Sequence, residues 1–131
     1  MIVVDASVVV TAVAAVGPDG TLARHRLTGE HLHAPHLLDL EVASALRQLV
    51  GRRAIKAAAA ATALDELTRL PLRRVPHVRL LPRCWELRHN LSTYDACYVA
   101  LAEALRLPLL TADQRLARAP GIRCDVELLT S

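Results

Sequence analysis

Residues 1–7 of the chain read M-I-V-V-D-A-S. A short apolar run that ends in an acid is typical of a buried strand, with Asp5 at its carboxyl end. The pattern returns in residues 108–113, P-L-L-T-A-D, where a predicted strand over residues 109–111 precedes Asp113. Two acids distant in sequence therefore each follow a predicted strand.

Strands and helices alternate along the rest of the chain. Further strands are predicted over residues 32–34, 72–75 and 122–124. Helices are predicted over residues 7–16, with Ser7 as cap, and over 22–27, 36–50, 55–70, 78–91, 94–107 and 113–119. This order predicts one α/β domain over residues 1–131, with a mainly parallel sheet and helices on both faces. Ligands of such sheets bind beyond the carboxyl ends of the strands, where Asp5 and Asp113 are expected.

The composition predicts a core of small aliphatic side chains. Hydrophobic residues make up 53% of the 131 residues, yet there is no Phe and only one Trp. A chain of this length buries a core without disulfides or a structural metal. Its three cysteines, Cys84, Cys97 and Cys124, contain no C-x-x-C pair, which argues against a zinc finger and a secreted disulfide scaffold. A reducing cytoplasm is the expected location, and Cys97 is expected to be an inert core thiol.

A membrane role is not expected. Residues 6–16 form an apolar stretch, but no Lys or Arg precedes it and Asp5 stands where a signal peptide carries positive charge. No segment approaches the ~20 apolar residues that span a bilayer.

The surface is mildly basic. The formal net charge is +3, from 16 Lys and Arg against 13 Asp and Glu, and Lys56 is the only lysine. Arginine suits phosphate contacts, although a balance of this size is also that of an ordinary solvated surface. Charge therefore supports a nucleic-acid partner without establishing one. Candidate phosphate contacts are Arg47, Arg52, Arg53, Arg83 and Arg88.

Four acids, Asp5, Glu41, Asp95 and Asp113, lie beside apolar segments. Taken singly, Glu41 resembles a boundary residue of an amphipathic helix, and Asp95 and Asp113 resemble helix N-terminal acids, with Thr93 as the cap before Asp95. Two unit charges about 4 Å apart repel by roughly 4 kcal/mol at an effective dielectric near 20. If the fold gathers the acids, a divalent cation is the partner that neutralises them.

The acids stand in motifs that resemble a known family. The motifs are V-V-D-A-S at Asp5, E-V-A-S-A-L at Glu41, T-Y-D-A-C-Y-V-A-L-A at Asp95 and L-L-T-A-D at Asp113. Together they resemble PIN-domain ribonucleases, and most closely the VapC-type toxins of bacterial toxin–antitoxin pairs. The resemblance covers nearly the whole chain. It implies a three-layer α/β/α fold with a sheet of four to five short strands.

The resemblance also implies an activity and partners. It implies an endoribonuclease that depends on Mg²⁺, or on Mn²⁺ as a substitute, and that inhibits translation and growth. Asp5 and Asp95 would be the main metal ligands, with Glu41 and Asp113 acting directly or through water. Ser7, Thr93 and Thr111 would orient these acids. RNA, a VapB-type antitoxin and a second copy of the chain are the implied partners. The small-residue run 57–61 suits a partner helix and intramolecular packing equally.

Other interpretations have less support. His31, His33 and His36 form an H-x-H-x-x-H run, but Pro35 separates the third from the other two and no Cys accompanies them. A metal-dependent phosphatase or a receiver domain would need a second acid close behind Asp5 or a late lysine. A catalytically inactive PIN-like binding module would not need all four acids.

Overall fold

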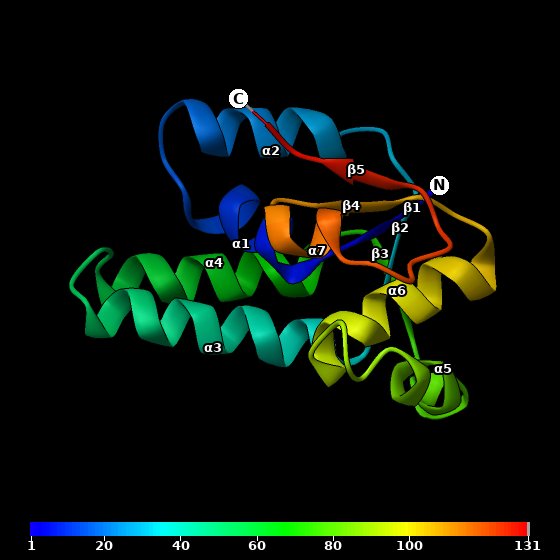
Figure 1. Ribbon diagram of the computed structural model, residues 1–131. Coiled ribbons are helices and arrows are strands. Elements are labelled where there is room, and N and C mark those ends of the chain that lie inside the picture. Colours follow the sequence, from blue (N-terminus) through cyan, green and yellow to red (C-terminus); the bar gives the residue numbers. More distant parts are fainter. Residues whose placement is uncertain (131) are drawn as a thin grey trace.

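The computed structural model describes residues 1–130, and its centre is one parallel sheet (Figure 1). Its strands are β1 (Ile2–Val4), β2 (Leu32–Pro35), β3 (Leu72–Val75), β4 (Leu109–Thr111) and β5 (Val126–Leu128), in the order β3-β2-β1-β4-β5. β1 lies in the middle and pairs with β2 and β4. Because β1 and β4 are parallel neighbours, Asp5 and Asp113 lie beyond the same edge of the sheet.

Helices cover both faces of the sheet, as expected for the three-layer α/β/α fold. They are α1 (Ala6–Ala14), α2 (Pro18–Leu27), α3 (Leu37–Gly51), α4 (Ala57–Arg69), the 3-10 turn η1 (Val78–Leu80), α5 (Leu81–Glu86), α6 (Thr93–Leu105) and α7 (Gln114–Arg118). α1 packs with α2, α3 and α4, whereas α6 packs on β1, β2 and β4 with α5 against it. The short α7 lies against β4 and β5.

The core consists of aliphatic side chains from the sheet, α1 and α6. Val3, Val4 and Leu109 are completely buried, and every residue of α6 from 96 to 102 is buried. Burying one Val or Leu side chain contributes about 1.5–3 kcal/mol. Asp5 and Asp113 therefore follow buried strands, and Asp95 lies at the start of the buried helix α6.

Two predicted segments differ from the structure. The strand predicted over residues 122–124 is wrong, because the last strand begins at Val126. The preceding segment bonds to side chains instead: Arg83 Nη2 donates to the Gly121 carbonyl, and the Arg123 amide donates to Glu103. The predicted helix over 78–91 is divided into η1 and α5, and α5 ends at Glu86. The division falls before Pro82, in the first turn of α5, because proline has no amide hydrogen to continue the helical hydrogen bonds of η1.

The start of the first helix also differs from the prediction. Ser7 does not cap α1: the N-cap position is Asp5, and its side chain makes no capping hydrogen bond within residues 1–130. Ser7 lies in the first turn, where its hydroxyl is free for the contacts described below.

No single helix within residues 1–130 is long and apolar enough to cross a membrane. α1 and α2 are long and apolar enough only when taken together, and the two helices are bent by 118° at their junction.

Candidate active site

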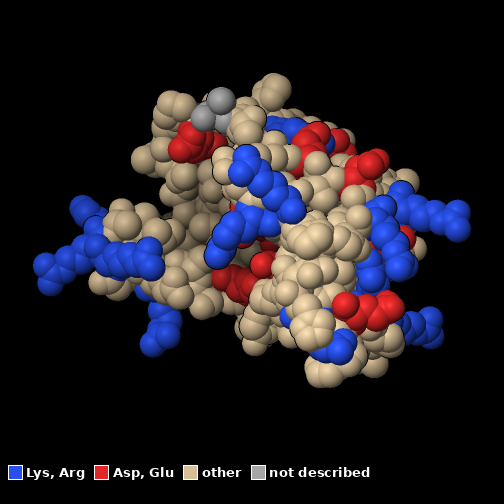
Figure 2. Space-filling view, in the orientation of Figure 1, with Lys and Arg blue, Asp and Glu red and all other residues tan. Residues whose placement is uncertain are grey.

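The four acids come from four elements that meet at the carboxyl edge of the sheet. Asp5 follows β1, and Asp113 follows β4. Asp95 lies in the first turn of α6, and Glu41 lies in the second turn of α3. Figure 2 shows acidic atoms in a hollow near the middle of one face, with basic side chains beside it in the region of α7.

Asp5 is the most firmly held of the acids. It is only 5% exposed, and its Oδ2 accepts hydrogen bonds from Ser7 Oγ at 2.6 Å and from Thr111 Oγ1 at 2.9 Å. Both hydroxyls are fixed in turn, because Ser7 Oγ accepts from the Ala112 amide and Thr111 Oγ1 accepts from the Asp113 amide. Oδ1 accepts no hydrogen bond within residues 1–130, so one oxygen of a rigid carboxylate stays free for a ligand.

Glu41 bonds to a buried tyrosine. Tyr98 on α6 is completely buried, and its hydroxyl donates to Glu41 Oε1 at 2.6 Å. Burial raises the pKa of Glu41 and the Tyr98 bond lowers it, while the charges of Asp5 and Asp95 raise it. Burial also raises the pKa of Tyr98, which keeps its proton as a donor. The tyrosine therefore fixes Glu41 in an environment that disfavours its charge.

Asp95 also lies in an environment that disfavours its negative charge. Burial raises its pKa, and the negative charges of Asp5 and Asp113 raise it further, while the Ser92 hydroxyl and Arg115 lower it. The prediction that Thr93 caps this helix is wrong: Ser92 is the N-cap, and its Oγ accepts from the Asp95 amide at 3.1 Å. The sequence did not identify Ser92 as the cap because Ser92 and Thr93 are both good N-cap residues. Which of them caps α6 depends on whether the helix begins at residue 93 or 94. Thr93 is exposed.

Asp113 caps α7, as the sequence predicted, since its Oδ1 accepts from the Arg115 amide at 2.9 Å. Arg115 was not predicted as a site residue. Its side chain is 94% exposed, its Nε lies 3.7 Å from Asp113 Oδ1, and its charge lowers the pKa of Asp95. The position of Arg115 in the sequence could have indicated this role: a residue two places after an acid that caps a helix has its amide, and here its side chain, beside that acid.

The donor set suits a hard cation. Asp5, Glu41, Asp95 and Asp113 offer only carboxylate oxygens, the ligand type that Mg²⁺ and Mn²⁺ prefer. Among residues 1–130, no three His, Cys, Asp or Glu side chains are close enough to form a complete ligand set as they stand. Mg²⁺ does not require one, because it keeps several waters and binds through one or two carboxylates together with substrate phosphates. The residues present therefore fit such an ion.

The arginines, histidines and cysteine considered in the sequence lie outside the group of four acids. Arg83 is engaged by Glu103 at 2.7 Å and by the Gly121 carbonyl, and Arg88 stacks over Trp85 at 4.6 Å. Both are therefore poorly placed for phosphate. Among residues 1–130, His31, His33 and His36 do not form a group that could hold a metal ion. Cys97 is buried, and burial raises its pKa to about 12, which fits an unreactive thiol.

Comparison with known proteins agrees with this fold. A family model described as PIN domain matches residues 2–122. Ribonuclease VapC1 of Mycobacterium tuberculosis is 49% identical over 128 residues, which cover 97% of this chain and 96% of the relative. A toxin–antitoxin complex from Klebsiella pneumoniae is similar in structure, with a TM-score of 0.69, 15% identity and coverage of 99% and 98% of the two chains. Mycobacterium tuberculosis VapC20, described as a sarcin-ricin loop cleaving toxin, gives a TM-score of 0.65, 19% identity and coverage of 83% and 87%.

The chain belongs to the PIN-domain family. Its similarity to VapC1 over nearly the whole length places it among the VapC ribonucleases, the toxins of toxin–antitoxin systems. The resemblance noted in the sequence motifs is thereby confirmed.

Proposed function

We propose that this protein is an Mg²⁺-dependent endoribonuclease that cuts phosphodiester bonds of RNA and so stops translation and growth. The observation that carries the proposal is the buried Asp5 carboxylate, held at one oxygen by Ser7 and Thr111 and free at the other. A carboxylate held this way among three further acids costs folding free energy, so its position is explained by a positively charged ligand.

Each acid has a distinct part in this proposal. Asp5 and Asp95 hold Mg²⁺, or Mn²⁺ in its place, and Glu41 and Asp113 complete the site directly or through water. When bound, the ion supplies charge neutralisation at the phosphate and an acidified water. Tyr98 keeps Glu41 oriented, and the Ser92 cap fixes the turn from which Asp95 projects. Arg115, exposed beside Asp113, contacts a phosphate of the RNA.

An antitoxin and a second copy of the chain are the proposed protein partners. Support for an antitoxin comes from the similar Klebsiella complex and from exposed apolar side chains on α3 and α4, Leu40 at 77% and Leu64 at 38%. Support for a homodimer comes from the side chains exposed on η1, α5 and the start of α6: Val78, Leu81, Trp85 and Tyr94. A cytoplasmic location accords with the RNA substrate and with three free cysteines.

The alternative enzyme class has little support in the structure. The single lysine, Lys56, is exposed at the N-terminus of α4, and the neighbour that contacts Asp5 is the Ser7 hydroxyl, not a second acid. A receiver domain or a phosphatase of the kind considered above needs groups that are not at this site.

The experiment is RNA cleavage by the purified protein with Mg²⁺, with Mn²⁺ and with EDTA. We expect cleavage with either ion, none with EDTA, and none from Asp5→Asn. The matched control is Asp65→Asn, which removes an exposed acid on α4 and should cleave normally. Within residues 1–130, Asp65 forms an ion pair with Arg69 alone. Undiminished activity in Asp5→Asn, or in EDTA, refutes the proposal. Induced expression should arrest growth with the wild type and not with Asp5→Asn, and sequencing of RNA ends identifies the cut site.

A further inference from the structure

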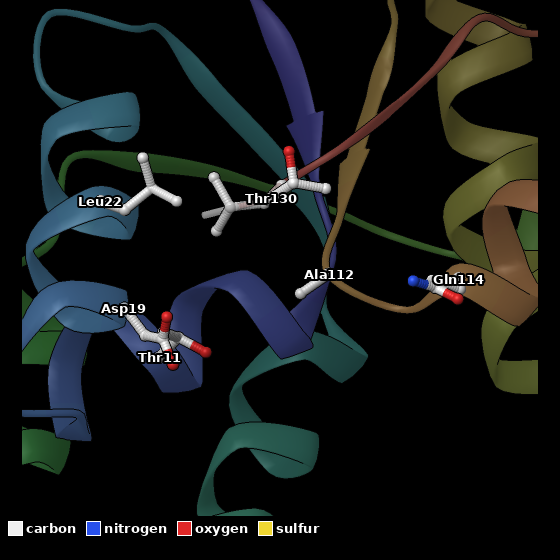
Figure 3. Close-up of a pocket in the computed structure, with 7 residues that line it drawn as sticks. Thr11, Asp19, Leu22, Ala112, Gln114 and Thr130 are labelled. Carbon is white, nitrogen blue, oxygen red and sulfur yellow. The ribbon is translucent and has the colours of Figure 1, made fainter.

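We propose that a cavity beside the acids binds one unstacked base of the RNA next to the scissile phosphate, and that it prefers guanine. The cavity has a volume of about 350 Å³ and lies between α1, α2, the β4–α7 connection and the C-terminal segment (Figure 3). The inference rests on the proposed ribonuclease activity and extends it to the choice of sequence. Single-stranded RNA is commonly recognised through splayed bases read on their Watson–Crick edges.

The cavity lies next to the acid site, although none of the four acids lines it. Two lining residues, Ala112 and Gln114, flank Asp113 directly. The Ala112 amide donates to Ser7 Oγ at 3.0 Å, and the same hydroxyl donates to Asp5. The opposite wall includes Thr11, one turn after Ser7 on α1. A base in this cavity therefore belongs to a nucleotide at or beside the phosphate that the acids face.

The lining suits a heterocyclic base and not a phosphate. Leu22 and Leu129 provide apolar walls, and Figure 3 shows Leu22 reaching from α2 into the cavity. Within residues 1–130, no Lys or Arg lines the cavity, whereas Asp19 brings a negative charge. A phosphate would be repelled there. A flat neutral ring gains apolar contact from both leucines, as in other small-ligand pockets.

The polar groups of the lining mostly accept hydrogen bonds. The Asp19 carboxylate makes no hydrogen bond or ion pair within residues 1–130, and an ionised carboxylate is an acceptor only. The Thr11 hydroxyl already donates to the Ser7 carbonyl at 2.9 Å, so it offers its lone pairs. Gln114 contributes an amide, and Thr130 a hydroxyl, each of which can both donate and accept. The cavity therefore selects a base edge rich in N–H donors.

Guanine has that edge. Its N1–H and N2–H₂ groups lie side by side and match the two oxygens of a carboxylate. Adenine and cytosine place one amino group beside a ring acceptor, and uracil places one N–H between two carbonyls, so each sets an acceptor against Asp19. A good bidentate pair discriminates against the wrong base by about 10- to 100-fold. Asp19 also stabilises the first turn of α2, and this structural role must be separated by experiment.

Cleavage of defined oligonucleotides tests the preference. Cuts in a random-sequence RNA should show guanine enriched at one position next to the cut. Substrates with guanosine or inosine at that position differ only by the N2 amino group. The wild type should cleave the guanosine substrate about 10-fold faster or more, and Asp19→Asn should bring the ratio close to one. Asp65→Asn should keep both the ratio and the rate.

A binding measurement keeps the inference separate from the proposed function. In EDTA, where no cleavage is expected, the guanosine oligonucleotide should shift the amide NMR signals of Leu22, Gln114 and Leu129, and the inosine oligonucleotide should require several-fold higher concentration. Absence of this difference overturns the inference, as does cleavage without base preference beside the cut. Guanine-selective binding by a protein that never cleaves overturns the ribonuclease proposal alone. Thermal melts of Asp19→Asn report the helix role, which does not alter the guanosine-to-inosine ratio.

Discussion

Replacing Thr111 by valine tests whether the hydroxyl contacts of Asp5 fix the site. Thr111 is completely buried at the end of β4, and its Oγ1 donates to Asp5 at 2.9 Å while accepting from the Asp113 amide at 3.1 Å. Valine has nearly the same shape but neither bond. The change therefore removes two polar contacts and little volume.

The structure sets the size of the effect. A hydrogen bond to a charged group contributes about 1.5–3 kcal/mol. Ser7 still donates to the same oxygen at 2.6 Å, and the bond of the Asp113 amide is only part-buried, so we expect a loss of about 2 kcal/mol in the free energy of unfolding. For a domain of this size, where each kcal/mol lowers Tm by roughly 3–5 °C, that is a decrease of about 6–10 °C.

Activity should fall further than stability predicts. Groups that orient metal-binding side chains typically change activity by about 10- to 100-fold when removed. Asp5 in Thr111→Val keeps its charge and loses its orientation, so RNA cleavage measured at 25 °C, where the variant stays folded, should fall within that range. Raising the Mg²⁺ concentration should restore part of it, because a mobile carboxylate still binds the ion weakly.

Thr111→Ser is the matched control. Serine keeps the hydroxyl and loses one methyl group, a cost of about 1 kcal/mol in a buried site. It should melt slightly below the wild type and retain most of its cleavage rate. The reasoning is refuted if serine and valine impair cleavage equally, or if valine leaves both Tm and cleavage unchanged.

Three further predictions follow from the charges of the site. Asp95→Asn should abolish cleavage yet raise Tm by a few degrees in EDTA at pH 7. The pKa of Asp95 is raised, so the folded protein holds this proton more tightly than the unfolded chain does. Stability therefore falls as the pH rises from the pKa of the unfolded chain to that of the folded protein, and asparagine avoids this loss. A Tm equal to or below that of the wild type contradicts this. Tyr98→Phe removes the bond that lowers the pKa of Glu41, so the acidic limb of the cleavage-rate profile should move to higher pH, while the exposed Tyr94→Phe should leave the profile in place. Arg115→Ala should raise KM for RNA and reduce the slope of log affinity against log salt by about 0.7, with Arg69→Ala as a charge-matched control that changes neither.

Local patterns in the sequence were enough for much of the fold. The strands at residues 72–75 and 109–111 have the predicted bounds, because each is a short run closed by a proline or an acid. The place of Asp5 and Asp113 at the carboxyl edge of a parallel sheet also followed from strand endings and helix alternation, whereas the pairing of β1 with β4 is known only from the structure. These features depend on neighbours in sequence, which is why they could be predicted.

Contacts between distant residues could not be predicted. Tyr98 and Glu41 are far apart in the chain, and neither motif indicates that their side chains share a hydrogen bond. The composition of residues 122–124 predicts a strand, but the backbone there bonds to side chains: Arg83 donates to the Gly121 carbonyl, and the Arg123 amide donates to Glu103. Arg83 was a candidate for phosphate on its residue type, and only the structure shows that Glu103 already engages it. In each case a tertiary partner decides the outcome.

The four acids are held by two physical means, and the difference explains how the fold tolerates them. Asp5 and Glu41 lie against the core, where hydroxyls of Ser7, Thr111 and Tyr98 donate to them. Asp95 and Asp113 lie at the N-termini of α6 and α7, where unpaired amides favour a negative charge by about 0.3–1 kcal/mol. Neither means removes the repulsion: burial is the largest cause of the raised pKa values of Glu41 and Asp95, but the charges of neighbouring acids raise both pKa values as well. The remaining charge is therefore available to any cation that enters, whether a metal ion or a basic side chain of a partner, and these two should compete.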